Sequence, residues 1–333
     1  MIRRMKKNGL VICMLLFSVS CNSMAKSDKD VFVVAQDNSG DYTTLGEAFR
    51  ALPDDSETWT TIQVKQGIYA EKLVLDVHKN KIRIVGEDPE NTVITWNDHT
   101  GKIADGDTIH TYTSYTLSVR SNDVIFENIT IQNSAGTVGQ AVACETQGDK
   151  IVFLNCRLVG NQDTFFTRGT VSRVYVKNSY IEGTTDYIFG PSIAVFDRCH
   201  IHSKKNSYIT AASTTEKNEY GYVFLDCRIT ATPEVTKLYL GRPWRSFAKT
   251  VFIRCELPPV ILPEGWDNWR SPEKEKTVYY AEYQSTGLGA APDKRVSWSR
   301  QLTDEEVAKY TLDRIFSKNT GGEPFSGNWI PLL

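Results

Sequence analysis

A short pattern of apolar and small residues recurs along the middle of the chain. Each copy has an aromatic or aliphatic residue, two variable residues, and then a small or apolar residue. The copies occupy residues 126–129, 153–156, 176–179, 196–199, 224–227 and 252–255. Their last positions are therefore 27, 23, 20, 28 and 28 residues apart. Self-similarity with a period of about 20 to 45 residues is typical of a solenoid, in which each repeat forms one coil.

The segments around these repeats predict strands and no long helix. They contain short runs rich in β-branched and aromatic residues, such as 174–176 and 223–225, and no sustained 3.6-residue periodicity interrupts them. This favours β coils over a leucine-rich horseshoe. We therefore predict an all-β chain: a single-stranded right-handed parallel β-helix (a solenoid) with a short C-terminal helical segment. The best helix candidate is residues 301–317, with Thr303 as its N-cap.

Several glycines stand at the ends of the predicted strands. We interpret them as turn residues that need positive φ angles. These are Gly67, Gly86, Gly160, Gly183 and Gly190.

Four of the seven cysteines share one position of the repeat, namely Cys156, Cys199, Cys227 and Cys255, and Cys144 stands apart from them. An exported chain would be expected to form disulfides. Equivalent positions on successive coils point the same way, however, which favours small buried side chains stacked inside the coil. We therefore expect free thiols at these four positions.

Two aspartates occupy equivalent places in neighbouring repeats. Asp163 lies seven residues after Cys156, and Asp186 lies seven after Ser179. The same offset on successive coils places the two carboxylates in one column, roughly 4.8 Å apart. Gln140 precedes Asp163 by 23 residues, and Gln162 adjoins it. Two carboxylates and two amides then meet on one patch, which is either a polar turn ladder or an acid–base site.

At these residues the chain resembles the pectin methylesterase (pectinesterase) family of carbohydrate esterases, of the bacterial type. The resemblance runs in order from residue 31 to about residue 300, and six or more ordered motifs make it specific. The matching motifs lie at 67–71, 111–114, 139–143, 162–164, 186–190, 240–244, 265–266 with Trp269, and 280–283.

The resemblance implies hydrolysis of methyl esters in pectin, a methyl-esterified homogalacturonan, through an acyl-enzyme. It makes Asp186 the nucleophile and Asp163 the general acid and base. Gln140 and Gln162 would stabilise the oxyanion, and Arg242 would orient Asp186. Trp244, Thr111, Phe166 and Trp266 would bind the substrate, although core packing is an equal interpretation for Trp266.

Other classes of function remain open at this stage. A β-helical glycosidase could also use paired carboxylates, a calcium-dependent lyase would need an acidic cluster, and a non-catalytic envelope β-helix would need neither. We find no phosphate-binding loop, and the five histidines show no metal-ligand spacing, although His200 and His202 could share a strand face. We predict no cofactor and no metal.

The N-terminus predicts export. Residues 1–25 have a basic start and an apolar stretch too short to span a bilayer, as in a signal peptide. Cleavage after Ala25 predicts a secreted or periplasmic protein; cleavage before Cys21 predicts a lipid anchor at the outer membrane. Losing four basic residues leaves 34 basic and 40 acidic residues, a net charge of −6, which disfavours binding to nucleic acid. We expect one domain over residues 26–333 and a monomer.

Overall fold

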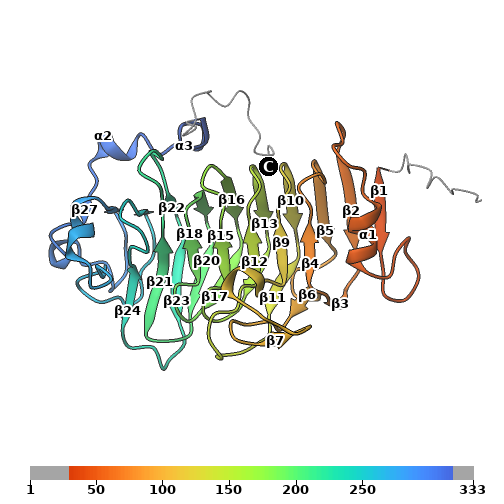
Figure 1. The fold of residues 1–333 in the computed structure, drawn as a ribbon. Helices are drawn as coiled ribbons and strands as arrows, with labels where there is room; N and C mark the ends of the chain where they lie inside the picture. The colour runs from red at the N-terminus through yellow and green to blue at the C-terminus, as the bar shows by residue number, and fades with distance from the viewer. Residues whose placement is uncertain (1–29, 318–333) are drawn as a thin grey trace, which may run out of the picture.

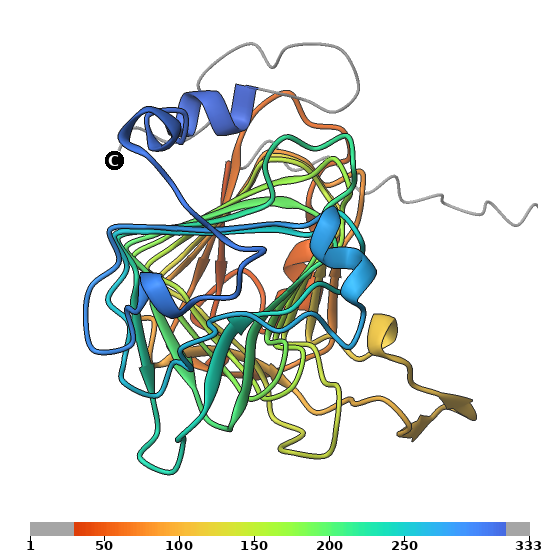
Figure 2. The same ribbon diagram turned by 90° about the vertical axis from the view of Figure 1, so that its left-hand side faces the viewer.

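The chain winds into a parallel β-helix. The computed structural model describes residues 30–317, so the predicted signal peptide, Cys21 and the last residues of the predicted domain lie outside the described part. Figure 1 shows the strands stacked side by side along one axis, and Figure 2 looks along that axis into the wound coil. Within the described residues the strands form three long parallel sheets, one for each side of the coil. The predicted right-handed β-helix is confirmed.

The strands of each sheet are given in their order along the chain. The first sheet contains β1 (Val31–Val34), β2 (Thr60–Val64), β5 (Ile82–Gly86), β10 (Val124–Glu127), β13 (Ile151–Leu154), β16 (Arg173–Lys177), β19 (Ile193–Asp197), β22 (Tyr222–Leu225), β25 (Lys249–Ile253), β26 (Tyr279–Tyr283) and β27 (Arg300–Gln301). The second contains β3 (Gly67–Ala70), β6 (Thr92–Trp96), β11 (Thr130–Asn133), β14 (Arg157–Val159), β17 (Tyr180–Gly183), β20 (His200–Ser203) and β23 (Arg228–Ala231). The third contains β4 (Leu73–Leu75), β9 (Leu117–Val119), β12 (Cys144–Thr146), β15 (Phe165–Thr167), β18 (Ile188–Gly190), β21 (Ser207–Ala212) and β24 (Leu238–Gly241).

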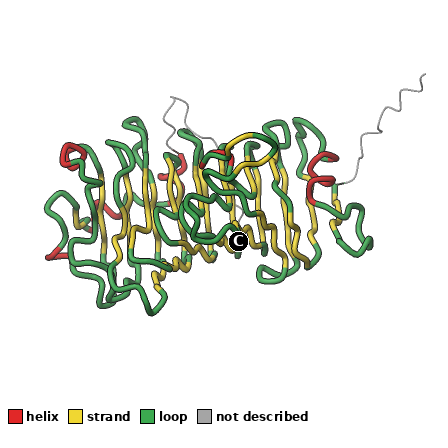
Figure 3. Tube along the Cα trace, turned by 60° about the horizontal axis from the view of Figure 1, so that its bottom comes forward, coloured by secondary structure: helices red, strands yellow, loops and turns green. Residues whose placement is uncertain are grey.

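The remaining elements decorate this coil. A hairpin of β7 (Ile103–Ala104) and β8 (Asp107–Thr108) stands out from the body (Figure 2). The helices are α1 (Leu45–Ala51), α2 (Asp304–Val307) and α3 (Leu312–Ser317), with 3-10 turns at Thr111–Thr113, Pro272–Lys276 and Pro292–Lys294. Figure 3 shows that loops and these short helices lie around the stacked strands.

The core is built from the predicted repeat. Its first residues pair from coil to coil in strict register, and all of them are fully buried: Phe126, Phe153, Val176, Phe196, Phe224 and Phe252. The ring centroids of neighbouring phenylalanines are as little as 4.3 Å apart. Burying one such side chain stabilises the fold by about 1.5–3 kcal/mol. The core therefore lengthens along the axis with each coil.

The third position of each repeat makes the turn out of the first sheet. It has a φ near +50° in every copy, at Asn128, Asn155, Asn178, Arg198, Asp226 and Arg254. Asparagine tolerates this left-handed conformation better than most residues. Of the five glycines predicted to have positive φ, only Gly190 does, at 127°. The prediction of a positive φ is wrong for the other four. At Gly86 the reason for glycine is space: a side chain there would meet the Asn128 carbonyl oxygen at 2.2 Å, so the glycine permits close packing between coils.

The four cysteines of the repeat lie inside the coil as expected. Cys156, Cys199, Cys227 and Cys255 are at most 1% exposed, and all are free in the structure. Burial raises the pKa of the Cys156 thiol to about 12. The four cysteines therefore serve as small core side chains, and the Cys156 thiol stays protonated at ordinary pH.

The predicted C-terminal helix is divided into two. Thr303 caps α2 as predicted: its hydroxyl accepts a hydrogen bond from the Glu306 backbone N–H at 3.2 Å. The predicted continuous helix over 301–317 was wrong. The Tyr220 hydroxyl donates to the Lys309 carbonyl at 3.0 Å, between the two helices. The second helix, α3, begins after Thr311, whose hydroxyl accepts a hydrogen bond from the Arg314 backbone N–H. Phe316 of α3 then packs on Tyr175, on the outer face of the first sheet.

Candidate active site

Asp163 and Asp186 stand side by side on neighbouring coils, as predicted. Strand β15 pairs with β18 so that Phe165 is opposite Ile188, and each aspartate precedes its paired residue by two positions. The Asp163 backbone N–H donates to the Thr185 carbonyl at 3.1 Å. Both aspartates have positive φ angles, 67° and 50°, which non-glycine residues adopt mainly where the surrounding structure holds them. They line one cavity of about 210 Å³.

The surroundings of the two carboxylates separate their protonation states. Burial, and then the negative charge of Asp186, raise the pKa of Asp163 well above its ordinary value, against the opposing effects of Gln140 and Arg242. Burial also raises the pKa of Asp186, but Arg242 opposes this effect with hydrogen bonds and charge. Asp163 is therefore the group that holds a proton, and Asp186 is the one that ionises first.

Arg242 is fixed by three neighbours. It follows β24, and its Nε and Nη2 atoms donate to the two carboxylate oxygens of Asp186 at 3.0 and 2.7 Å. Its guanidinium carbon lies 3.9 Å from the ring centroid of Tyr208 and 3.7 Å from that of Trp269. A bidentate, charge-assisted pair held between two rings leaves the Asp186 carboxylate little freedom to turn.

Gln140 and Gln162 meet at the same cavity. They form a parallel bridge with each other, so Gln140 is aligned with Gln162 and lies 22 residues before it. A hydrogen bond from the Gln140 side chain lowers the pKa of Asp163. The Gln140 amide therefore contacts Asp163, and Gln162 lines the same cavity; neither side chain brings a charge that would neutralise a carboxylate.

Aromatic side chains form much of the remaining wall of the cavity. These are Trp244, Trp269, Phe189 and Tyr112, and Thr111 lies among them. The predicted positions of Thr111 and Trp244 are thus consistent with contact to a substrate.

Phe166 and Trp266 are corrections. Phe166 is only 2% exposed and stacks on Phe189, its register partner on the next coil, with centroids 4.3 Å apart, so its ring is covered within the wall. Trp266 is 1% exposed and packs against Phe252 and Tyr280 in the core. A ring with no exposed face cannot stack on a sugar. The more exposed rings at the cavity include Trp269, which the same motif contains, and Tyr112, which follows Thr111.

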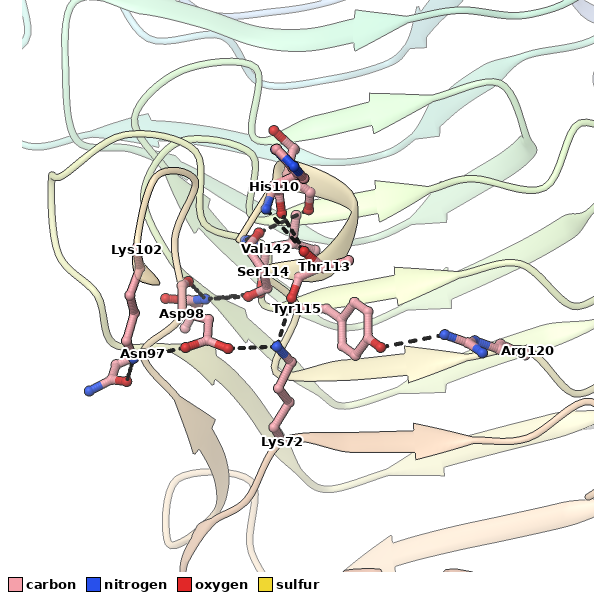
Figure 4. Close-up of polar contacts among 12 residues, drawn as sticks. Lys72, Asn97, Asp98, Lys102, His110, Thr113, Ser114, Tyr115, Arg120 and Val142 are labelled. Carbon is pink, nitrogen blue, oxygen red and sulfur yellow. Dashed lines mark hydrogen bonds and ion pairs between the residues drawn. The ribbon is translucent and has the colours of Figure 1, made fainter. Parts of the chain in front are cut away.

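An excursion of the chain over residues 97–114 holds this wall in place. Figure 4 shows Asp98 between Lys72 and Lys102, whose ammonium groups are 2.6 and 2.8 Å from its carboxylate oxygens. Burial would raise the pKa of Asp98, but these hydrogen bonds lower it overall. The amide of Asn133 lies within 3.1 Å of the carbonyl oxygens of Asp98, Ser114 and Val142.

The excursion also contacts the oxyanion candidate directly. The Thr100 backbone N–H donates to the Gln140 carbonyl at 2.9 Å, and the Thr100 hydroxyl is 3.1 Å from that of Thr111. The loop that carries Gln140 is therefore positioned by a segment that lies far from Asp163 and Asp186 in sequence. No motif in the sequence indicated this connection.

The other polar groups considered from the sequence lie elsewhere. His200 and His202 share one face of β20, as expected, and a ring nitrogen of each is 2.7 Å from the Thr230 hydroxyl. Among residues 30–317, no group of three or more histidine, cysteine, aspartate or glutamate side chains is placed to hold a metal ion. No helix in that part of the chain is long and apolar enough to cross a membrane. The absence of a metal and a cofactor stays a prediction.

Comparison with known proteins gives one family. The pectinesterase family model matches residues 31–319. Pectinesterase 31 of Arabidopsis thaliana is 38% identical over 284 residues, which cover 83% of this chain and 89% of that protein. Pectin methylesterase from carrot superposes with a TM-score of 0.79 at 34% identity, covering 85% of this chain and 92% of the other. These two relatives are plant proteins, so the bacterial type stays a prediction.

One solved relative contains a sugar chain. A pectin methylesterase in complex with a hexasaccharide superposes with a TM-score of 0.75 at 27% identity, covering 85% of this chain and 96% of the other. Its fold is therefore shared over nearly the whole described part of the chain.

Proposed function

Because this chain belongs to the pectinesterase family, we propose that it hydrolyses the methyl esters of galacturonate units in pectin, releasing methanol and leaving pectate. The observation that carries the proposal is the pair formed by Asp163 and Asp186. Two buried carboxylates lie side by side, one of them is bound by Arg242, and two neutral amides face the same cavity. These groups are the ones that acyl transfer from an ester requires.

Asp186 is the nucleophile in this mechanism. Its carboxylate oxygen attacks the ester carbonyl carbon, and a tetrahedral intermediate with a negative oxygen forms. Arg242 keeps Asp186 ionised despite its burial, because two charge-assisted hydrogen bonds favour the charged form. The amides of Gln140 and Gln162 donate to the developing oxyanion.

Asp163 then acts first as an acid and afterwards as a base. Its raised pKa keeps the proton that methoxide needs in order to leave as methanol. The intermediate collapses to an acyl-enzyme, an anhydride between Asp186 and the galacturonate carboxyl carbon. The ionised Asp163 next takes a proton from water, the resulting hydroxide attacks the same carbon, and the Asp186 carboxylate departs. Asp163 is thereby protonated again, and no cofactor takes part.

The substrate chain would lie over the aromatic wall. Trp244, Trp269 and Tyr112 are the partly exposed rings around the carboxylates, and flat apolar faces suit pyranose rings. The similarity to an enzyme whose structure is in complex with a hexasaccharide supports this placement.

Methanol release from highly methylated pectin by the mature protein tests the function. We expect methanol without new reducing ends and without unsaturated products. Asp186→Asn should abolish nearly all turnover, because a neutral amide cannot attack the ester, while circular dichroism shows an intact fold. Reducing ends would instead indicate a glycosidase, and unsaturated products a lyase. Methanol release by Asp186→Asn close to that of the parent protein would refute the nucleophile assignment.

The location of the protein is part of the proposal. Residues 1–25 have the features of a signal peptide, and we infer an exported enzyme, secreted or periplasmic. The mass of the mature chain distinguishes cleavage after Ala25 from lipidation at Cys21, which would anchor the enzyme at the outer membrane. We also infer a monomer, which light scattering at several concentrations would check.

A further inference from the structure

Asn133 is a buried polar side chain that the mechanism above does not use. It is the last residue of β11, it pairs in register with Trp96 on the preceding coil, and it is 3% exposed. Residues 134–139 follow it as a loop, and Gln140 stands at the end of that loop. Asn133 therefore lies where the chain leaves the second sheet on its way to the candidate active site.

The side-chain amide of Asn133 joins three segments of the chain. Its Nδ2 atom donates to the carbonyl oxygens of Asp98 at 2.9 Å, Ser114 at 3.1 Å and Val142 at 3.1 Å. An amide nitrogen has two N–H groups, so one of them is shared between two of these carbonyls. Asp98 and Ser114 lie near the two ends of the excursion over residues 97–114. Both ends of the excursion are therefore tied to the strand that contains Val142.

The same side chain holds the loop before Gln140 at both of its ends. Its Oδ1 atom accepts a hydrogen bond from the Ala135 backbone N–H at 3.0 Å, and Val142 follows Gln140 by two residues. Gly136 and Gly139 of the loop have φ angles of 82° and 127°. In the described part of the chain, apart from their chain neighbours, no atom lies within 4 Å of where a Cβ would stand at either glycine. The loop itself is loosely packed, so its ends determine where Gln140 lies.

Ser114 provides a second contact to the same backbone. It is fully buried, its hydroxyl accepts from the Val142 N–H at 3.2 Å, and it donates to the Thr111 carbonyl at 2.9 Å. Figure 4 shows Ser114 beside Val142. The Val142 carbonyl also accepts from the Thr116 N–H at 3.1 Å. Both backbone polar groups of Val142 are thus bonded to residues at the end of the excursion.

The position of Gln140 matters for the chemistry. A donor stabilises an oxyanion when it is held in place before the reaction, so that no rearrangement is needed as the charge develops. A displacement of about 1 Å can lower a rate by about 100-fold. The Gln140 side chain also contacts Asp163. A shift of the backbone at residues 140–142 would therefore move a donor away from the place where it is needed.

We propose that Asn133, supported by the Ser114 hydroxyl, is a positioning residue for the Gln140 amide. Its hydrogen bonds hold the backbone of residues 140–142 in the place from which that amide reaches the oxyanion. The inference rests on the proposed function and adds to it a residue that does not touch the substrate. Its effect on catalysis passes through Gln140.

Replacing Asn133 by leucine tests the role. Leucine is similar in size but has neither donor nor acceptor, so the bonds to the three carbonyls and to the Ala135 N–H are lost. Asn133→Leu should lower kcat for methanol release by about 10- to 100-fold and change KM by less than about twofold. A change confined to KM would overturn the inference.

Asn218 provides a matched control. It is also fully buried, its Nδ2 atom donates to the Thr170 carbonyl at 3.0 Å, and its Oδ1 atom accepts from the Thr215 hydroxyl at 3.0 Å. It does not line the cavity. Asn218→Leu should lose stability in thermal unfolding, as Asn133→Leu does, but it should keep the kcat of the parent protein. An equal loss of kcat in both variants would overturn the inference, because the effect would then be general.

A double-mutant cycle tests whether the effect passes through Gln140. In the Gln140→Ala background there is no amide to position, so Asn133→Leu should change kcat by less than about twofold. The same fold loss in both backgrounds would refute the proposal. Ser114→Ala is a milder variant for the same cycle, since it removes one hydrogen bond to Val142. It should lower kcat by about tenfold in the parent background alone, and a folded Ser114→Ala with the kcat of the parent protein would also refute it.

Titration of Asp163 without turnover keeps this inference separate from the proposed function. Burial and the charge of Asp186 raise the pKa of Asp163, whereas the Gln140 hydrogen bond and the charge of Arg242 lower it. Carbon-13 NMR of the aspartate carboxyl groups, assigned with Asp163→Asn, follows this pKa. Asn133→Leu and Gln140→Ala should each raise it, and the double variant should raise it no further than Gln140→Ala. If the parent protein releases no methanol while this pattern is present, the esterase proposal fails and the positioning of Gln140 stands. If Asn133→Leu leaves the pKa of Asp163 unchanged, the inference is refuted whatever the esterase activity.

Discussion

Replacing Arg242 by lysine tests how the nucleophile is kept ionised. Lysine keeps the positive charge but has a single ammonium group in place of the planar fork. The change therefore removes one of the two hydrogen bonds to Asp186, at 3.0 and 2.7 Å, and also the stacking on Tyr208 and Trp269. The ion pair itself is weakened without being abolished.

The structure gives the size of the effect. One hydrogen bond to a charged group contributes about 1.5–3 kcal/mol, and a partly buried cation over a ring contributes about 0.5–2 kcal/mol. The loss is then about 2–5 kcal/mol, which corresponds to about 30-fold to 5000-fold in kcat/KM at the optimal pH if the pair acts on the transition state.

The pH dependence is the sharper part of this prediction. Burial raises the pKa of Asp186, and Arg242 opposes that effect. With a weaker partner, the pKa of Asp186 in the free enzyme rises further. Asp186 must be ionised to attack, so the acidic limb of the kcat/KM profile should move to higher pH in Arg242→Lys.

The assay is the initial rate of methanol release at low substrate concentration across the acidic range. Arg245→Lys is the control, because Arg245 is an exposed neighbour in the same loop and should leave the acidic limb in place. An Arg242→Lys profile with a lower maximum but an unmoved acidic limb would refute the claim that Arg242 sets the ionisation of Asp186.

Two further predictions concern the same cavity. Gln162→Ala should lower kcat by about 10²- to 10³-fold with a small change in KM, since it removes an oxyanion donor; a change in KM alone would show that Gln162 binds sugar instead. Asp163→Asn should be inactive yet more stable than the parent protein at neutral pH. The folded pKa of Asp163 is raised above the unfolded value of about 3.9, so its ionisation costs stability as pH rises above about 4, and an amide escapes that cost. Thermal unfolding at several pH values checks this: the difference should vanish below about pH 4, and an asparagine variant less stable than the parent at pH 7 would contradict it.

The fold and the alignment of Asp163 with Asp186 on neighbouring coils could be predicted because both follow from the periodicity of the sequence. Equal offsets from the repeat place Asp163 and Asp186 in one column, and strand register in the structure does the same. The repeat also predicts the buried thiols, since residues at equivalent positions face the same side. In a solenoid, residues one repeat apart in sequence become neighbours in space. Few other contacts therefore have to be known in order to predict which residues meet.

Features outside the repeat could not be predicted in this way. Trp266 and Trp269 share a motif, yet only the conformation of the loop decides which ring is buried, and Trp269 has a φ of 59° that a sequence does not reveal. Tyr208 holds Arg242 from a separate coil. The break at Thr311 depends on a hydrogen bond from Tyr220, 89 residues distant from Lys309 in sequence. Each of these outcomes is set by tertiary contacts that carry no periodic signal.

The stacking of coils also sets the spacing of the residues in the candidate active site. Asp163 and Asp186 belong to successive coils, and Arg242 reaches Asp186 across the coil that carries Tyr208. The backbones of these residues are therefore separated along the axis by multiples of one coil height, about 4.8 Å, and the side chains span the difference. Lengthening a loop changes none of these heights, whereas removing the single coil between β18 and β24 would bring the backbone of Arg242 one full step closer to that of Asp186. Evolution and protein engineering can thus vary the loops of this enzyme freely, but they can alter the spacing of Asp163, Asp186 and Arg242 along the axis only in whole steps.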